Sequence, residues 1–190
     1  MTKPEVILID YNPDWPRKYE EEKNRILEVT GKEIMAIAHI GSTSIKGLAA
    51  KPIIDIMAGI KKLKDFEALI QPLDKIGYQY IPKAEFKERK FFRKGLWGRG
   101  TCHLHICEID SNEWKEKLFF RDFLRLHPES VEEYSTFKKE LAAKFQFDRA
   151  RYTEEKGPFV RAIIDKALMN GPLVEPSNQR ESGTKKSYSF

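Results

Sequence analysis

The chain has 190 residues, 41% hydrophobic and 12% aromatic, which is enough for one sizeable core and gives no sign of a second domain. Its net charge of +5 and pI near 9.0 favour an anionic partner such as a nucleotide or a phosphorylated metabolite, and support nucleic acid only weakly. The N-terminus has too short an apolar run for a signal peptide and no stretch is long enough to span a bilayer, so the sequence argues against a membrane protein and predicts a soluble, cytoplasmic one.

The first predicted elements are a helix and two strands. Apolar residues recur at helical spacing from Trp15 to Val29, where Asp14 is placed to cap the start of a helix and Gly31 its end. The β-branched run from Glu33 to Ile40 predicts a strand that ends abruptly in Gly-Ser-Thr-Ser. A second strand-like run, Pro52 to Ile60, follows this small polar turn.

The middle of the chain alternates between helix and strand. Apolar residues from Leu63 to Leu73 predict a helix that Pro72 must kink or stop early. Cys102 and Cys107 lack CxxC spacing and are interpreted as buried, reduced thiols. The other predicted elements are strands at Tyr78 to Ile81, Phe86 to Lys94 and Cys102 to Ile109, with a hairpin loop at Gly95 to Thr101.

The last third is predicted to be helical. Helical periodicity covers residues 113–126, 131–148 and 157–170, and these helices are expected to cover one face of the sheet. Phe159, Ile163 and Leu168 form an apolar stripe on the last of them. Residues 171–190 are polar and rich in Gly, Pro, Ser and Lys, which predicts a disordered tail after a single domain at residues 1–170.

The turn after the first strand is a candidate phosphate site. Gly41 permits a positive φ and lets backbone N–H groups approach a ligand, while Ser42 and Ser44 add hydroxyl donors. Short Gly-Ser turns are common as structural loops, and taken alone this one favours that interpretation.

Asp55 favours the functional interpretation because it lies among isoleucines, in Ile53-Ile54-Asp55-Ile56-Met57. An unpaired carboxylate there would be costly to desolvate, so a cation, an arginine or several donors must compensate it. Beside a phosphate-type turn, a divalent metal is the favoured partner.

A pair of histidines is the next candidate. His103 and His105 share one face of a predicted strand, and metal binding is about as favoured for them as an ordinary polar environment. Glu108 should face the opposite side and is the weaker candidate.

Basic residues from two segments are candidates for anion contact. Arg89 and Arg93 share a strand face and suit bidentate phosphate contact, although the segment is equally suited to be a solvated edge strand. A second group follows the long helix and is interpreted as a surface charge run, with an anion clamp as the alternative: Arg149, Arg151, Tyr152 and Lys156.

These motifs resemble two known groups of proteins. The Gly41-Ser42 turn after a hydrophobic strand, followed by Asp55-Ile56, resembles the nucleotidyltransferase superfamily typified by DNA polymerase beta. More closely, a set of motifs between Pro4 and Asn170 resembles the GrpB family: YNPDW, HIGSTSIKGLAAKPIIDI, CHLHICE and FFRDFLRLHPE.

The resemblance implies an α+β fold with a mixed β-sheet of nucleotidyltransferase type, flanking helices and a mainly helical C-terminal half. It implies that Gly41 and Ser42 hold nucleotide phosphates and that Asp55 holds Mg²⁺. Met57 occupies the position of the second metal acid, and His105, with His103, is expected to replace a missing acid. Such a mixed ligand set would also accept Mn²⁺ or Zn²⁺.

Two functions therefore stay open. The first is metal-dependent transfer of a nucleoside monophosphate from a nucleoside triphosphate to an acceptor, with Asp55 and His105 as catalytic residues. The second is a non-catalytic module that binds a nucleotide or another phosphorylated small molecule. Met57 favours the module, and the retained Asp55 favours the enzyme.

Overall fold

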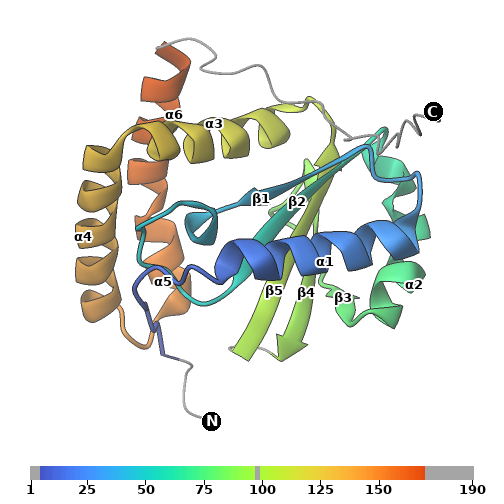
Figure 1. The fold of residues 1–190 in the computed structure, drawn as a ribbon, viewed down its shortest axis with the longest axis horizontal. Helices are drawn as coiled ribbons and strands as arrows, with labels where there is room; N and C mark the ends of the chain where they lie inside the picture. The colour runs from blue at the N-terminus through green and yellow to red at the C-terminus, as the bar shows by residue number, and fades with distance from the viewer. Residues whose placement is uncertain (1–4, 97–98, 170–190) are drawn as a thin grey trace, which may run out of the picture.

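The structure, a computed structural model, describes residues 5–96 and 99–169 (Figure 1). The predicted tail from residue 171 lies outside these residues. A five-stranded sheet with the order β1-β2-β5-β4-β3 forms the centre. β2 and β5 run parallel, and the other neighbouring pairs are antiparallel. The strands are β1 (Ala36–Ile40), β2 (Ile54–Ile60), β3 (Tyr78–Tyr80), β4 (Arg89–Leu96) and β5 (Arg99–Glu108).

Helices occupy both faces of the sheet and one end. The described part of the chain is helical almost throughout from residue 112 onward, so the predicted α+β class with a mixed sheet and a mainly helical C-terminal half is confirmed. The helical segments are α1 (Trp15–Thr30), η1 (Ser42–Ser44), η2 (Leu63–Phe66), α2 (Glu67–Lys75), α3 (Asn112–Leu126), α4 (Pro128–Lys144), α5 (Arg149–Glu155) and α6 (Gly157–Met169).

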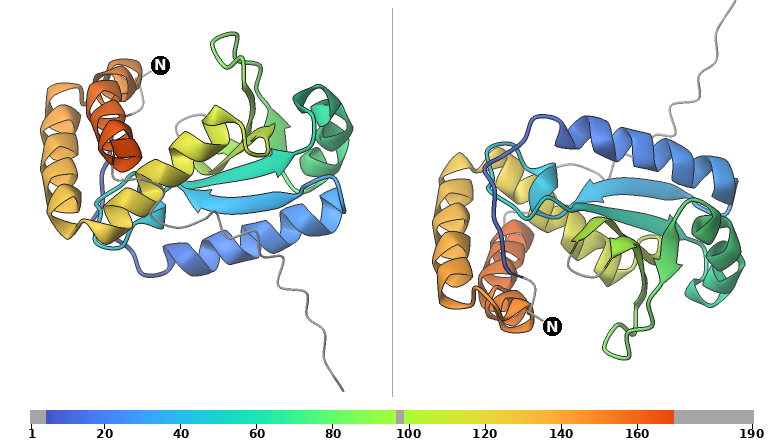
Figure 2. Two further views of the ribbon diagram at one scale, coloured as in Figure 1. Left: turned by 90° about the horizontal axis from the view of Figure 1, so that it is seen from above. Right: turned by 90° about the horizontal axis from the view of Figure 1, so that it is seen from below.

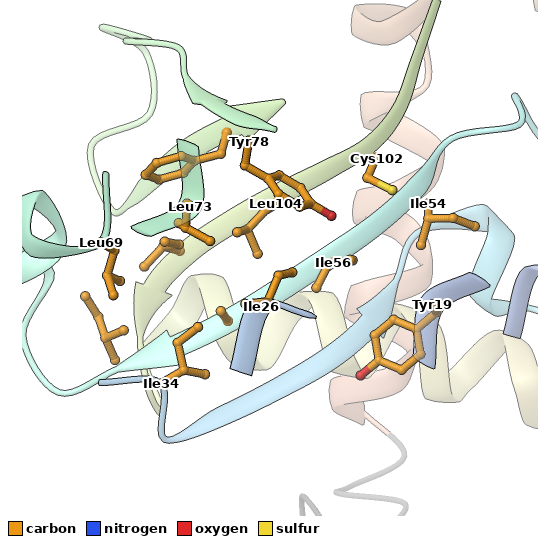
Figure 3. Packing of buried hydrophobic residues seen from close by; sticks show 14 of the residues in the cluster. Tyr19, Ile26, Ile34, Ile54, Ile56, Leu69, Leu73, Tyr78, Cys102 and Leu104 are labelled. Atoms are coloured by element: carbon orange, nitrogen blue, oxygen red, sulfur yellow. The ribbon is translucent and has the colours of Figure 1, made fainter. Parts of the chain in front are cut away.

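One face of the sheet packs against α1 and α2. Side chains alternate along a strand, and the even-numbered residues of β2 and β5, such as Ile56 and Leu104, point into this core. Ile26 of α1 and Leu73 of α2 are completely buried against them, and Figure 3 shows how closely these residues pack. The apolar periodicity that predicts the two helices is therefore the surface that they bury.

One carboxylate enters this core from α1. Glu22 is only 8% exposed, and its oxygens accept hydrogen bonds from the Tyr78 hydroxyl and the Lys94 ammonium, each at 2.9 Å. Arg25 pairs with the same carboxylate at 3.0 Å. The negative charge of Glu22 is thus matched by cations and a hydroxyl donor, as a buried charge requires.

The opposite face of the sheet packs against α3. Met57 of β2 and Cys107 of β5 contact Trp114 and Leu118 of α3 in a separate cluster. Helices α4 and α6 pack on α3 and extend beyond the sheet, and α5 joins them (Figures 1 and 2). The expectation that all the C-terminal helices cover one sheet face is wrong, because α4 and α6 bury apolar residues on α3 and on one another, and Leu141 of α4 packs against Val6 and Tyr152.

Several boundaries of helices and strands differ from those predicted from the sequence. Pro72 lies inside α2, and the helix continues for another turn to Lys75. Asp14 stands at the start of α1, but its carboxylate pairs with Arg17 and accepts no capping hydrogen bond from the backbone. The hairpin between β4 and β5 is shorter than expected, since the strands reach Leu96 and Arg99 and residues 97–98 lie outside the description.

The predicted helix over residues 131–148 is also longer at its start and shorter at its end. It begins at Pro128, where proline is tolerated because the first turn needs no N–H donor, and it ends at Lys144. Asp148 then caps α5 by accepting a hydrogen bond from the Arg151 amide at 3.1 Å. Leu168, which the sequence places in the apolar stripe of α6, is 53% exposed. None of the described helices is long and apolar enough to cross a membrane.

Candidate functional site

The predicted site residues of the strands form rows across the sheet. Asp55 of β2 is in register with His103 of β5, which is in register with Arg93 of β4. Because alternate side chains share a face, these residues point away from α1 and α2. The shared face of His103 and His105 is confirmed.

A cavity of about 550 Å³ lies over this face. Its walls are the Gly-Ser turn, strands β2, β4 and β5, the connection between β3 and β4 that extends from the sheet in Figure 2, and helices α4 and α5. Seven lysine and arginine side chains line it against two acidic ones, Asp55 and Glu85. The cavity is therefore suited to an anionic ligand.

Gly41 fits closely against Asp55. Its φ is +68°, in the left-handed region, and a Cβ atom at this position would lie 2.6 Å from an Asp55 carboxylate oxygen. A side chain here would be strained by the backbone conformation and would also collide with Asp55. The positive φ predicted for Gly41 is confirmed, and the glycine holds the turn against the carboxylate.

Asp55 and His103 form a pair, with Oδ1 and Nδ1 3.1 Å apart. Burial acts to raise the pKa of Asp55, but the hydrogen bond from His103 and the nearby His103, His105 and Lys51 outweigh it, so the pKa lies below its usual range. Asp55 is therefore ionised at neutral pH, and the His103 nitrogen donates to it.

His105 lies one row further along the sheet, in register with Met57 and Phe91. Its Nδ1 atom is buried and has no hydrogen-bond partner among the described residues. Burial lowers the pKa of His105 to about 3, so the ring is neutral at physiological pH. Phe86 and Phe91 pack against the ring.

The predicted metal ligands do not form a three-ligand centre in the described part of the chain. No group of three or more His, Cys, Asp or Glu side chains is arranged there to hold a metal ion. Asp55 is one carboxylate oxygen donor beside the turn, and Mg²⁺ is often held by one or two carboxylates together with substrate phosphates. Metal binding at Asp55, His103 and His105 stays a prediction.

Arg89 and Arg93, predicted to contact phosphate, both line the cavity. Arg89 forms an ion pair with Glu113 of α3, and its guanidinium lies 3.7 Å from the centre of the Phe86 ring. Its charge is already compensated, which makes it a weaker anion site than the sequence suggests. Ser44 does not line the cavity, because it is buried and its hydroxyl donates to the Gly41 carbonyl at 2.6 Å.

Four other cations lie close together at the turn, and we call Lys51, Lys138, Arg149 and Lys156 the four-cation cluster. None of them makes an ion pair with an acidic side chain in the described structure. The Lys51 and Lys156 ammonium groups lie 5.2 and 4.8 Å from the centre of the buried Tyr152 ring. The cluster therefore concentrates positive charge that Asp55 offsets only in part.

Burial and the nearby positive charges lower the pKa values of these lysines. Burial, with the nearby Lys156 and Arg149, lowers the pKa of Lys51 to about 8. Burial, with Lys156 and Lys51, lowers the pKa of Lys138 to about 7. An anion placed among them would remove this penalty by favouring the charged forms.

Two of these cations come from the segment interpreted as a surface charge run. The structure supports the clamp alternative for Arg149, Tyr152 and Lys156, which line the cavity. Arg151 is exposed and pairs with Glu155. The sequence reasoning missed Lys138, although it lies at helical spacing between the buried Tyr134 and Leu141, and a lysine in an apolar stripe is a signal that could have identified it.

Two arginines of α3 donate hydrogen bonds to backbone carbonyl groups in and next to the Gly-Ser turn. Arg125 donates to the Ser44 carbonyl at 3.1 and 2.9 Å, and Arg121 donates to the His39 carbonyl at 3.2 Å. His39 Nε2 contacts the Thr43 hydroxyl at 3.0 Å. These contacts give the arginines of the FFRDFLR motif a structural role that sequence reasoning did not assign.

Comparison with known proteins gives consistent matches. A family model described as "GrpB protein" matches residues 5–166. The "Glutamate-rich protein GrpB" of Alkalihalophilus pseudofirmus is 36% identical over 169 residues, covering 87% of this chain and 97% of that protein. The crystal structure of conserved protein GrpB from Enterococcus faecalis superposes with a TM-score of 0.80 at 32% identity, covering 86% of this chain and 98% of that one.

A third match is to part of a longer protein. The "Dephospho-CoA kinase" of Mycolicibacterium paratuberculosis is 26% identical over 188 residues, which covers 85% of this chain and 46% of that protein. The chain thus spans less than half the length of that relative.

Proposed function

The chain belongs to the GrpB family, and from that premise we propose that it binds the phosphates of a nucleoside triphosphate or a related phosphorylated small molecule in the cationic cavity. The observation that carries the proposal is the four-cation cluster, whose members make no ion pair with an acidic side chain within the described residues, although the charge of Asp55 acts on Lys51 and Lys156. A folded protein that holds one buried and three half-buried cations with too few counter-charges is less stable for it, so a function must favour their retention.

The positions of the four cations support a polyphosphate rather than a single anion. Lys51 comes from the connection between β1 and β2, and Lys138 from α4. Arg149 begins α5, and Lys156 directly follows its last residue. Lysine and arginine bind phosphate oxygens through short, charge-assisted hydrogen bonds. Cations on separate elements can contact several phosphates of one chain at once, which would also neutralise the repulsion among the lysines.

The named relative is in keeping with this ligand class. A protein called dephospho-CoA kinase contains a segment that matches this chain, and its name describes a reaction on a phosphorylated compound. Since the chain covers less than half of that protein, the kinase reaction itself is not carried over to it.

Thermal unfolding tests the proposal with ATP, pyrophosphate and adenosine as ligands, in the absence of divalent metal. ATP and pyrophosphate at about 100 times their dissociation constants should stabilise the fold by about 2.7 kcal/mol, which raises Tm by about 5–10 °C. Adenosine should give no shift. Lys156→Met should lose most of the effect, whereas Lys139→Met, an exposed neighbour of Lys138, should keep it. If neither phosphate compound shifts Tm, the proposal fails.

A second candidate is metal-dependent nucleotidyl transfer, and the retention of ionised Asp55 beside the turn favours it. In this function Asp55 would hold a divalent ion that also contacts the bound phosphates. Adding Mg²⁺, Mn²⁺ or Zn²⁺ should then increase the stabilisation by ATP in wild type but not in Asp55→Asn. Pyrophosphate released from labelled triphosphate would show catalysis, and its persistence in His105→Ala would remove His105 from the mechanism.

A further inference from the structure

Ser42 is in contact with a buried lysine that the phosphate-binding proposal does not fully explain. Lys138 Nζ lies 3.0 Å from the Ser42 hydroxyl and also contacts the Ala49 carbonyl. Lys138 is 1% exposed, and both residues line the cavity. A ligand in the cavity therefore reaches the Ser42 hydroxyl, which the buried amine already contacts.

This arrangement has the features of an activated nucleophile. An activated hydroxyl has a base within about 2.6–3.2 Å, and a third group orients that base. Here the Ala49 carbonyl orients Nζ, and the Tyr134 ring lies 4.7 Å from it. Serine paired with lysine is a known alternative to serine paired with histidine.

Lys138 is suited to accept a proton. The titratable groups that act on it are Lys51 and Lys156, and Tyr134 is its neighbour on the same helix. Burial and the two lysines lower the pKa of Lys138 to about 7, so a substantial fraction of the amine is neutral at physiological pH. A base with a pKa near the working pH is the effective kind.

We propose that Ser42 is a nucleophile that accepts a phosphorus group from a phosphoanhydride bound in the cavity, and that Lys138 is its general base. The proposal rests on the proposed function, because the phosphates must first bind to the four-cation cluster. It goes beyond that function by making the protein itself the covalent acceptor.

The step is an in-line displacement at phosphorus. Ser42 Oγ forms a bond to the phosphorus atom, and the bridging P–O bond of the anhydride breaks. The Oγ proton moves to Lys138 Nζ, and the displaced phosphate or polyphosphate leaves as an anion. Lys51 and Lys156 lie where they can stabilise the charge that develops on the phosphate oxygens.

The competing explanation is that Lys138 only anchors the turn and contributes charge. In that case Ser42 would never carry phosphorus, and replacing Lys138 would change affinity and stability alone. Covalent labelling distinguishes the two, because an anchoring role cannot produce a labelled serine.

The experiment incubates the full chain with ATP labelled at the α or the γ phosphorus, denatures it, and maps retained label by mass spectrometry of peptides. Tm with and without ATP is measured on every variant to follow binding and folding. Ser42→Ala removes the nucleophile and leaves every cation in place. Lys138→Arg keeps the charge but cannot act as a base, since arginine stays protonated. Lys139→Met is the matched control on the same helix.

We expect wild type and Lys139→Met to carry label on Ser42, with the α or γ position showing which phosphorus is attacked. Ser42→Ala should carry no label even at ATP concentrations that saturate its Tm shift, and Lys138→Arg should label at least about 100-fold more slowly, the usual effect of losing a general base. If wild type binds ATP but stays unlabelled, Ser42 is not a nucleophile, and the proposed function still stands. Ser42→Ala labelled like wild type also overturns it. If ATP does not bind at all, both proposals fall.

Discussion

The two faces of the sheet differ in how far the charges buried on them are compensated by side chains of opposite charge. Under α1, Glu22 is matched by Lys94 and by the Tyr78 hydroxyl, so every partner lies within the chain. Under α4 and α5, Lys51 and Lys156 lie close together and make no ion pair in the described structure, and the charge of Asp55 offsets only part of their burial. The first arrangement is what stability requires, and the second lowers stability unless an anion from outside completes it.

This contrast identifies the functional region better than any single motif. Both regions are equally unexpected from hydrophobic patterning, since each places long charged side chains in the interior. Charge balance separates them, because a satisfied pair needs no ligand and an unsatisfied cluster does.

The largest effect on stability is expected for the Glu22–Lys94 pair, where the buried charge is compensated. Lys94→Met leaves Glu22 without its main cation, and we expect it to lower the free energy of unfolding by about 3 kcal/mol, as for other buried pairs that lose one partner. Urea unfolding measures this directly. The double variant Glu22→Leu with Lys94→Met should recover part of the loss. A loss below about 0.5 kcal/mol for Lys94→Met would remove the contrast between the two faces.

The next effect is the pH dependence of ligand affinity. The pKa of Lys51, about 8, lies below its ordinary value of 10.5, and a bound anion should raise it. Binding therefore takes up a proton, and affinity should fall as pH rises from 7 to 10. Because Lys51 loses its proton over this range in the unliganded protein, the fall should approach about 100-fold. Calorimetry of ATP binding across this range checks the sign, and an affinity that is flat or rises would contradict it.

A smaller effect is expected when one member of the cluster is neutralised. Lys51→Met should weaken binding of pyrophosphate at least about 10-fold, whereas the unliganded protein should be unchanged or more stable by about 1 kcal/mol, since a like charge has been removed. Urea unfolding together with calorimetry measures both quantities. A variant that binds normally and unfolds more easily would mean that Lys51 is structural.

The smallest effect is expected at an arginine whose charge is already matched. Arg89 lines the same cavity but pairs with Glu113, so Arg89→Met should reduce affinity for pyrophosphate by less than about threefold. The same titration provides the comparison with Lys51→Met. Equal losses in the two variants would show that charge balance does not decide which cations bind the ligand.

Local sequence patterns account for much of the fold and for part of the site. The strand around Asp55, the positive φ of Gly41 and the shared face of His103 and His105 all follow from residues close together in the chain. Each depends on alternation or on a single turn, which a sequence displays directly.

The rest of the site depends on packing between distant segments. Lys138 reaches Ser42 only because α4 packs beyond the end of the sheet, and Arg125 reaches the Ser44 carbonyl only because α3 crosses the turn. No local pattern encodes these contacts, although a lysine within the apolar stripe of α4 marks Lys138 as unusual. Sequence reasoning therefore overestimated Arg89 and missed Lys138 as sources of positive charge. Charge balance, too, becomes visible only when partners distant in sequence are placed in space.

The most direct measurement is a crystal structure with a bound triphosphate such as ATP. The account predicts phosphate oxygens within hydrogen-bond distance of Lys51 and Lys156, next to the Ser42 turn. Phosphates bound against Arg89 and Arg93 instead, or a cavity that stays free of ATP at concentrations that saturate it in solution, would contradict it.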